Sequence, residues 1–172
     1  MDRVEALLAA RRWEPVCLRT NIAAPELLMR KNGFVKARVD SNVLRKGETE
    51  LREAIRAVAP GWYEDVKIVL NRNVTCEPHT DSANRGHSFI LFLGDFTGGA
   101  LVFEDGVRIA EPRRWHCING RVRHWNEPHQ GTKHSVVLYR PAVSSKSTII
   151  HTRRCEKKND RDLPGHRSRE KA

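Results

Sequence analysis

A series of short apolar segments, which begins after Asp65 and continues to Tyr139, constrains the fold of this chain more than any other feature. Each segment has four to six residues and is rich in β-branched, leucine and aromatic side chains, as β-strands are. Turn-forming pairs such as Asp105-Gly106 and Asn119-Gly120 lie between them. Strands this short, joined by tight turns, predict an antiparallel sandwich or barrel. The predicted strands are residues 66–70, 88–93, 100–103, 114–118, 122–125 and 134–139.

The chain before these segments has the apolar spacing of helices instead. Asp2 and Glu5 predict a helix start of the capping-box type. A second helix is predicted over 49–59, because apolar residues recur on one helical face there and Pro60-Gly61 ends it. We therefore expect an α+β fold, in which N-terminal helices pack on one sheet of a β core at about 65–141.

The length of 172 residues suits one domain, which we expect over 1–150. Residues 151–172 carry eight Lys and Arg side chains and almost no apolar ones, so we expect a basic, disordered tail there. The formal net charge of the whole chain is +10. A positive field of this size predicts attraction to a polyanion such as DNA or RNA.

Compartment and redox state follow from what the sequence lacks. No apolar run reaches the length of about 20 residues that a membrane-spanning helix needs, and the N-terminus has no secretory signal. We therefore expect a cytoplasmic or nuclear protein that is not secreted and has no membrane partner. The four cysteines are far apart, which predicts free thiols rather than a zinc site.

The segment Glu77-Pro78-His79-Thr80-Asp81 follows the first predicted strand. In extended chain, residues two apart project to the same face. His79 and Asp81 can therefore direct an imidazole nitrogen and a carboxylate oxygen to one point. Two histidines and one carboxylate on one side of a metal leave its other positions open, which suits non-haem Fe(II) oxygenase chemistry.

The third ligand is expected from a later strand, and His116, His124, His129 and His134 are the candidates. His124 is the predicted ligand, because it ends a predicted strand and a turn follows it. His129 remains the main alternative. It lies only four residues before Lys133, which leaves little chain to put a ligand and a cation on separate strands.

Lys133 and Ser135 are two apart at the start of the last predicted strand, so both can point to one face. A lysine ammonium is a compact point charge that can bind a carboxylate. We expect Lys133 and Ser135 to bind the remote carboxylate of 2-oxoglutarate.

The order of these motifs resembles the 2-oxoglutarate/Fe(II) dioxygenases. More narrowly, four segments resemble the TET/JBP branch, whose members oxidise methyl groups on pyrimidine bases. They are Leu70-Asn71-Arg72-Asn73, the segment from Cys76 to Asn84, the segment from Gly86 to Ile90, and the segment from Leu93 to Leu101. The match covers about 66–141, somewhat under half the chain.

The resemblance implies a double-stranded β-helix (jelly-roll) core, with Fe(II), 2-oxoglutarate and O2 as cofactor and co-substrates. It implies iron ligands His79, Asp81 and His124, and 2-oxoglutarate on Lys133 and Ser135 with Asn71 beside them. Lys133 departs from the pattern, because TET-like proteins usually carry arginine there and lysine is more familiar in prolyl 4-hydroxylases.

A flipped base would need stacking partners and a basic rim. Asn84, Arg85 and Arg123 are the predicted substrate-binding residues. Further arginines that flank the motifs are Arg72, Arg113, Arg114 and Arg121, and the aromatic candidates are Trp62, Phe92, Trp115 and Trp125. Three functions remain open: hydroxylation of a methylated pyrimidine such as 5-methylcytosine in DNA or RNA, protein (prolyl) hydroxylation, and non-catalytic binding of nucleic acid by a basic module.

Overall fold

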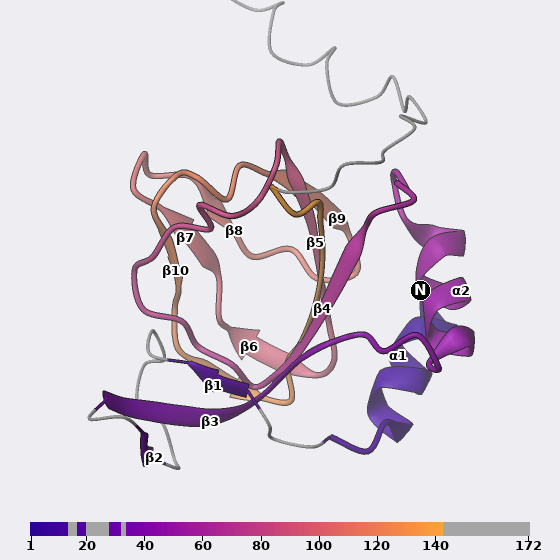
Figure 1. Cartoon of the computed structure of the whole chain (residues 1–172), viewed down its shortest axis with the longest axis horizontal. Coiled ribbons are helices and arrows are strands. Elements are labelled where there is room, and N and C mark those ends of the chain that lie inside the picture. The colour runs from indigo at the N-terminus through magenta and orange to yellow at the C-terminus, as the bar shows by residue number, and fades with distance from the viewer. Residues whose placement is uncertain (14–16, 20–27, 32–33, 143–172) are drawn as a thin grey trace, which may run out of the picture.

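The computed structural model describes residues 1–13, 17–19, 28–31 and 34–142, and for 17–39 it describes the backbone alone. These residues form an α+β protein with antiparallel strands and two helices, α1 (Asp2–Ala10) and α2 (Thr49–Val58) (Figure 1). The strands are β1 (Cys17–Arg19), β2 (Leu28–Lys31), β3 (Phe34–Val43), β4 (Lys67–Arg72), β5 (Ser88–Leu93), β6 (Phe96–Gly98), β7 (Leu101–Phe103), β8 (Arg108–Ile109), β9 (Trp115–Ile118), β10 (His124–Asn126), β11 (His129–Gly131) and β12 (His134–Tyr139).

The strands of the described chain form a large main sheet and two small sheets. The main sheet has the order β1-β3-β4-β12-β5-β9, with β2 paired to β3. The small sheets are β10-β7-β8 and β11-β6. In Figure 1, β7 and β10 lie on one side of the main sheet and both helices lie on the other.

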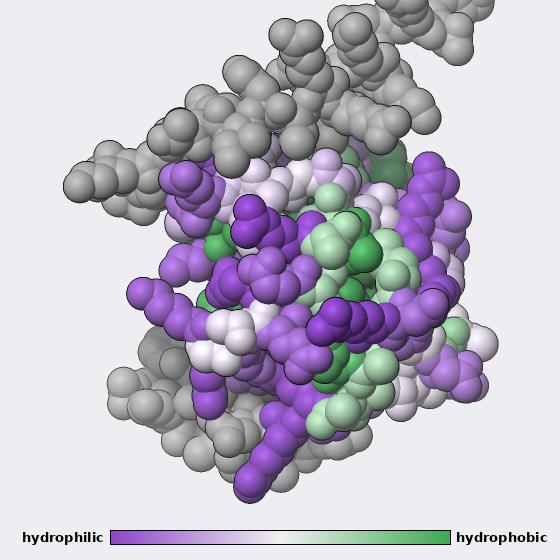
Figure 2. All heavy atoms as spheres, turned by 90° about the vertical axis from the view of Figure 1, so that its right-hand side faces the viewer, coloured by the Kyte–Doolittle hydropathy of each residue, from purple (hydrophilic) through white to green (hydrophobic). Residues whose placement is uncertain are grey.

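The strand β5 is buried at every position, because both faces of the main sheet are covered. Leu91 and Leu93 pack with apolar residues of α1 and α2, such as Leu8 and Ile55. Phe92 projects to the other face and packs with residues of β7 and β9. Polar side chains cover much of the outer surface of the helix side, with apolar ones visible between them (Figure 2).

Several sequence predictions are confirmed. The α+β class is correct, and the helix predicted over 49–59 is α2. The strands predicted over 88–93 and 134–139 match β5 and β12. Among the described residues, no helix has the length and apolar character that a membrane crossing requires.

Three predictions about local structure were wrong. Asp2 does not cap α1, since Met1 is the N-cap, and Asp2 and Glu5 both pair with Arg113 instead. The β structure does not begin after both helices, because β3 precedes α2 and pairs with β4. His129 and Gly98 lie outside the predicted strands, yet they are paired with each other in the β11-β6 ladder.

The expected single domain over 1–150 remains a prediction, and the expected tail over 151–172 lies outside the described residues. Cys76 is buried and Cys117 is exposed, and the expectation of thiols rather than a zinc site remains a prediction. The side chains of Cys17 and Cys155 are not among those described.

Candidate metal centre

The centre begins with a pair of backbone hydrogen bonds between His79 and His124. Each N–H donates to the carbonyl oxygen of the other residue at 2.9 Å, as in an antiparallel bridge. The two imidazole rings therefore project side by side, with ring centroids 4.4 Å apart. The fold therefore brings His124, the histidine that the sequence favoured as the third ligand, next to His79.

Both rings are held in one orientation by their own chain. The Nδ1 of His79 lies 2.7 Å from the carbonyl oxygen of Glu77, and the Nδ1 of His124 lies 2.8 Å from that of Val122. A carbonyl can only accept, so each Nδ1 carries a hydrogen, and in the neutral ring this leaves the lone pair on Nε2. A neutral imidazole held in this way is the form that binds a metal.

Asp81 completes the group of three ligand atoms. Its Oδ1 lies 3.8 Å from His79 Nε2, and its Oδ2 lies 4.0 Å from His124 Nε2. One ligand atom from each residue lies within 4.8 Å of the others. Ligand atoms on adjacent positions of an ion at about 2.1 Å are roughly 3 Å apart, so a closure of about 1 Å forms the site.

Asp81 is held by contacts of its backbone and its carboxylate. Its N–H donates to the carbonyl of Gly120 at 2.7 Å. The Asn84 amide donates to Asp81 Oδ2 at 3.3 Å and to Ser88 Oγ at 3.4 Å. A Cβ on Gly120 would lie 3.1 Å from that of Asp81, so the close approach needs a glycine or a shift of the neighbours. Asn84, predicted as a substrate contact, is buried and touches a candidate ligand.

The three candidate ligands open into a cavity of about 200 Å³ beside the main sheet. Ser135, Val137 and Tyr139 of β12 line it, as does Lys133 just before that strand. These residues are every second one along the chain, as expected for one face of a strand. The lining residues are Val69, Asn71, Val74, Cys76, His79, Asp81, Asn84, Ile90, Leu101, Ile118, His124, Asn126, Lys133, Ser135, Val137 and Tyr139. The predicted metal ligands and the predicted 2-oxoglutarate residues therefore share one cavity.

Lys133 is the buried cation of this cavity, with 4% of its surface exposed. Its Nζ donates to the carbonyl of Gly99 and lies 4.4 Å from the centre of the Phe92 ring. Burial lowers the pKa of Lys133 to about 8, and a charge interaction with Cys76 partly opposes the shift. The ammonium therefore lies among few polar groups, where an anion would stabilise its charge.

The other histidine candidates lie elsewhere in the described structure. His116 Nε2 lies 3.1 Å from the carbonyl of Glu111, and His129 Nδ1 lies 3.5 Å from the Thr75 hydroxyl. His134 is buried and stacks on Trp13, with ring centroids 5.6 Å apart. Burial lowers the pKa of both His129 and His134, which favours their neutral forms.

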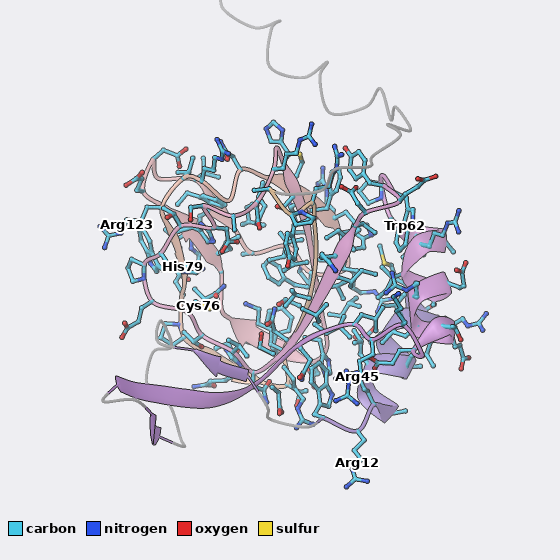
Figure 3. The ribbon with its side chains drawn as sticks, in the orientation of Figure 1. Arg12, Arg45, Trp62, Cys76, His79 and Arg123 are labelled. Atoms are coloured by element: carbon cyan, nitrogen blue, oxygen red, sulfur yellow. The ribbon has the colours of Figure 1, made fainter. Side chains whose placement is uncertain are left out.

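The arginines that flank the motifs fall into two groups. Those in ion pairs are Arg72 with Asp40, Arg113 with Asp2 and Glu5, and Arg114 with Glu111. Arg85, Arg121 and Arg123 are exposed and have no side-chain ion pair within the described residues. Arg123 directly precedes His124, and Figure 3 shows it pointing outward on the side of the molecule that holds His79.

None of the four predicted aromatic platforms lines the cavity. Trp62 lies on the helix side, far from His79 (Figure 3), and Phe92 is 1% exposed. Tyr139 is the aromatic residue that does line it, and sequence reasoning missed it. The sequence contained the necessary pattern, because in an extended strand Tyr139 projects to the same face as Lys133 and Ser135.

Comparisons with known proteins give little further information. No protein-family model and no curated protein matches the sequence. Among solved structures, the chain is similar to protein NMB1881 from Neisseria meningitidis, with 15% identity and a TM-score of 0.34. That match covers 51% of this chain and 92% of the other. A likeness this weak carries no argument about fold or function.

Proposed function

We propose that this chain is an Fe(II)- and 2-oxoglutarate-dependent dioxygenase. The observation that carries the proposal is that the two histidine Nε2 atoms and the Asp81 carboxylate face the cavity that Lys133 also lines. Two nitrogen donors and one carboxylate suit Fe(II) and leave positions open for further ligands. The fixed Nδ1 hydrogens of His79 and His124 support the same assignment.

The co-substrate proposal is supported by the charges and donors of the cavity. Lys133 supplies a cation, while Ser135 and Asn71 supply neutral donors on the same face. Bound 2-oxoglutarate and O2 would supply oxidative decarboxylation to succinate and carbon dioxide, coupled to hydroxylation of a C–H bond. The protein's own part is to hold the ligands, bind the remote carboxylate and limit the access of water.

We propose a double-stranded β-helix, or jelly-roll, for the β core. Its support is the arrangement of the small β10-β7-β8 sheet opposite the main sheet, with apolar residues such as Ile90 and Phe103 packed between them. In such folds two antiparallel sheets enclose a site between them.

A methylated pyrimidine base in DNA or RNA is the proposed substrate, as in the TET/JBP branch. Arg85, Arg121 and Arg123 are exposed cations on the segments that carry or adjoin the candidate ligands, which suits a phosphate backbone. Tyr139 gives the cavity an aromatic ring on which a flipped base can stack. Asn84 adds a polar group beside Asp81.

Protein hydroxylation on proline is the second candidate, and Lys133 favours it. A lysine in this place is more familiar in prolyl 4-hydroxylases, and the buried Lys133 lines the cavity that the candidate metal ligands face. A proline-containing peptide and a methylated oligonucleotide are therefore the two substrates to compare.

The test is an anaerobic titration of the protein with Fe(II) and then 2-oxoglutarate. We expect a weak visible charge-transfer band that needs both components. Its absence in folded protein would contradict both enzyme candidates and leave a basic binding module. Where the band forms, the substrate that stimulates succinate release tells the two enzyme candidates apart.

A further inference from the structure

Three polar side chains on neighbouring strands form a connected row beside Lys133. Ser41 of β3, Asn71 of β4 and Ser135 of β12 stand in register across the main sheet. The Ser41 hydroxyl donates to Asn71 Oδ1 at 2.6 Å, and the Asn71 amide nitrogen donates to Ser135 Oγ at 2.8 Å. Only Asn71 and Ser135 line the cavity, and Ser41 lies behind them with 3% of its surface exposed.

The buried Ser41 hydroxyl determines which group donates and which accepts in each of these hydrogen bonds. Ser41 needs an acceptor because its hydroxyl is shielded from water, and the amide oxygen of Asn71 provides it. The amide nitrogen must then face Ser135, whose oxygen accepts from it. The proton of the Ser135 hydroxyl is left for another acceptor, and within the described residues it donates to no protein group.

We propose that Ser41 and Asn71 are positioning residues, which fix the Ser135 hydroxyl as a donor to the anionic group that Lys133 binds. Lys133 and Ser135 are two apart on the cavity side, so an ammonium and a hydroxyl proton face the same space. Such a pair selects a carboxylate, which only accepts, over a neutral or cationic group. This inference rests on the proposed function and adds to it how the remote carboxylate of 2-oxoglutarate is recognised.

A purely structural role for the row predicts a different outcome. Hydrogen bonds between strands could stabilise the sheet without affecting any ligand. Asn71→Asp separates the two roles, because it keeps the shape and replaces the amide donor by an acceptor. The Ser135 hydroxyl would then donate to Asp rather than to the cavity, and the new negative charge would oppose an anion.

The experiment measures the affinity of the Mn(II)-loaded protein for 2-oxoglutarate by calorimetry. We expect Asn71→Asp to weaken binding by about 10- to 100-fold, the range of a hydrogen bond to a charged group. Ser41→Ala is expected to weaken it by about three- to tenfold, because the amide is then free to turn. The affinity for Mn(II) alone should stay unchanged in both, which separates a weakened hold on the anion from general damage.

Asn42→Asp is the matched control, since Asn42 neighbours Ser41 on β3 but stands in register with Leu70, which packs on the helix side. Its 2-oxoglutarate affinity should equal that of the wild type. A double-mutant cycle adds a second measurement. In a Ser135→Ala background, Ser41→Ala should have no further effect, because the hydroxyl that it orients is gone.

The outcomes distinguish the two proposals. If the wild type binds Mn(II) but no 2-oxoglutarate, the proposed function fails and this inference fails with it. If the wild type binds 2-oxoglutarate and the Ser41 and Asn71 variants bind it equally well, only the positioning role is overturned. If Asn71→Asp does not fold, the Ser41 and Ser135 cycle decides, and additive effects there would overturn the proposal.

Discussion

His79 and His124 hydrogen-bond to each other through their backbones in both directions, although 45 positions separate them in the sequence (124 minus 79). Because the bridge fixes both Cα positions, the two imidazoles face one point before any metal binds. Preorganisation of this kind lowers the cost of ordering ligands when an ion arrives. The bridge therefore couples the fold of β10 to the geometry of the candidate centre.

Replacing any of His79, Asp81 or His124 by alanine should weaken binding of Mn(II) or Fe(II) sharply. Removal of a direct ligand should cost more than the roughly 10- to 100-fold typical of residues that only support a ligand. Equilibrium dialysis or electron paramagnetic resonance with Mn(II) measures it. His129→Ala is the matched control and should bind like the wild type, since its ring lies beside Thr75. Loss of metal from the His129 variant with normal binding by the His124 variant would reverse the ligand assignment.

Asn84→Ala should weaken metal binding by about 10- to 100-fold, because Asn84 orients the Asp81 carboxylate. Asn84→Asp should weaken it less than alanine if its added charge still faces the metal side. Calorimetric titration with Mn(II) gives both values in the absence of substrate. An unchanged Mn(II) affinity in Asn84→Ala, together with a raised KM for substrate, would make Asn84 a substrate contact alone.

Lys133→Met should raise the free energy of unfolding at pH 7 while it abolishes tight binding of 2-oxoglutarate. Burial lowers the pKa of Lys133 from 10.5 to about 8, so the folded state holds the lysine proton less tightly than the unfolded chain does. That cost is fully present below about pH 8 and disappears as pH rises towards 10.5. After the hydrogen bond to Gly99 is subtracted, we expect a net gain of about 1 to 2 kcal/mol.

Urea unfolding at pH 7 and pH 10 measures this effect. The gain from Lys133→Met should be largest at pH 7 and shrink at pH 10. Lys67→Met, at an exposed position of β4, is the control and should change stability little at either pH. A variant less stable than wild type at pH 7 would mean that the buried ammonium contributes net stability.

The predictable part of the site came from local spacing. His79 and Asp81 are two apart, and so are Lys133 and Ser135, and the strand period alone puts each pair on one face. The same period reaches Tyr139, which sequence reasoning overlooked in favour of tryptophans. Trp125 lies between two cavity-lining residues of β10, so its side chain projects to the opposite face.

The rest of the site depends on contacts that spacing does not encode. Ser41 meets Asn71 only because β3 joins the main sheet in one particular register, and the sequence led us to predict no strand there. Gly120 was expected only as a turn residue, yet it also provides the space beside Asp81. Likewise, which arginines are neutralised depends on distant partners such as Asp2 for Arg113.

Arg123→Gln should weaken binding to DNA or RNA and reduce its salt dependence. Removing one cation from a phosphate reduces the slope of log K against log salt by about 0.9 on duplex DNA. Fluorescence anisotropy at several salt concentrations measures both quantities. Arg114→Gln is the control, because Arg114 already pairs with Glu111 and should change the slope less. Equal effects from the two variants would mean that Arg123 has no special place in the interface.

The most direct test of the proposed activity is mass spectrometry of an oligonucleotide that contains 5-methylcytosine, after incubation with the protein, Fe(II), 2-oxoglutarate and O2. We expect 5-hydroxymethylcytosine and an equimolar yield of succinate from the wild type, and neither from Asp81→Ala. Single- and double-stranded DNA and RNA are compared in parallel. If 5-methylcytosine stays unoxidised in all of these substrates, although the wild-type protein binds Fe(II) and 2-oxoglutarate, the result would contradict base hydroxylation. Formation of hydroxyproline in a peptide substrate would instead assign the chain to protein hydroxylation.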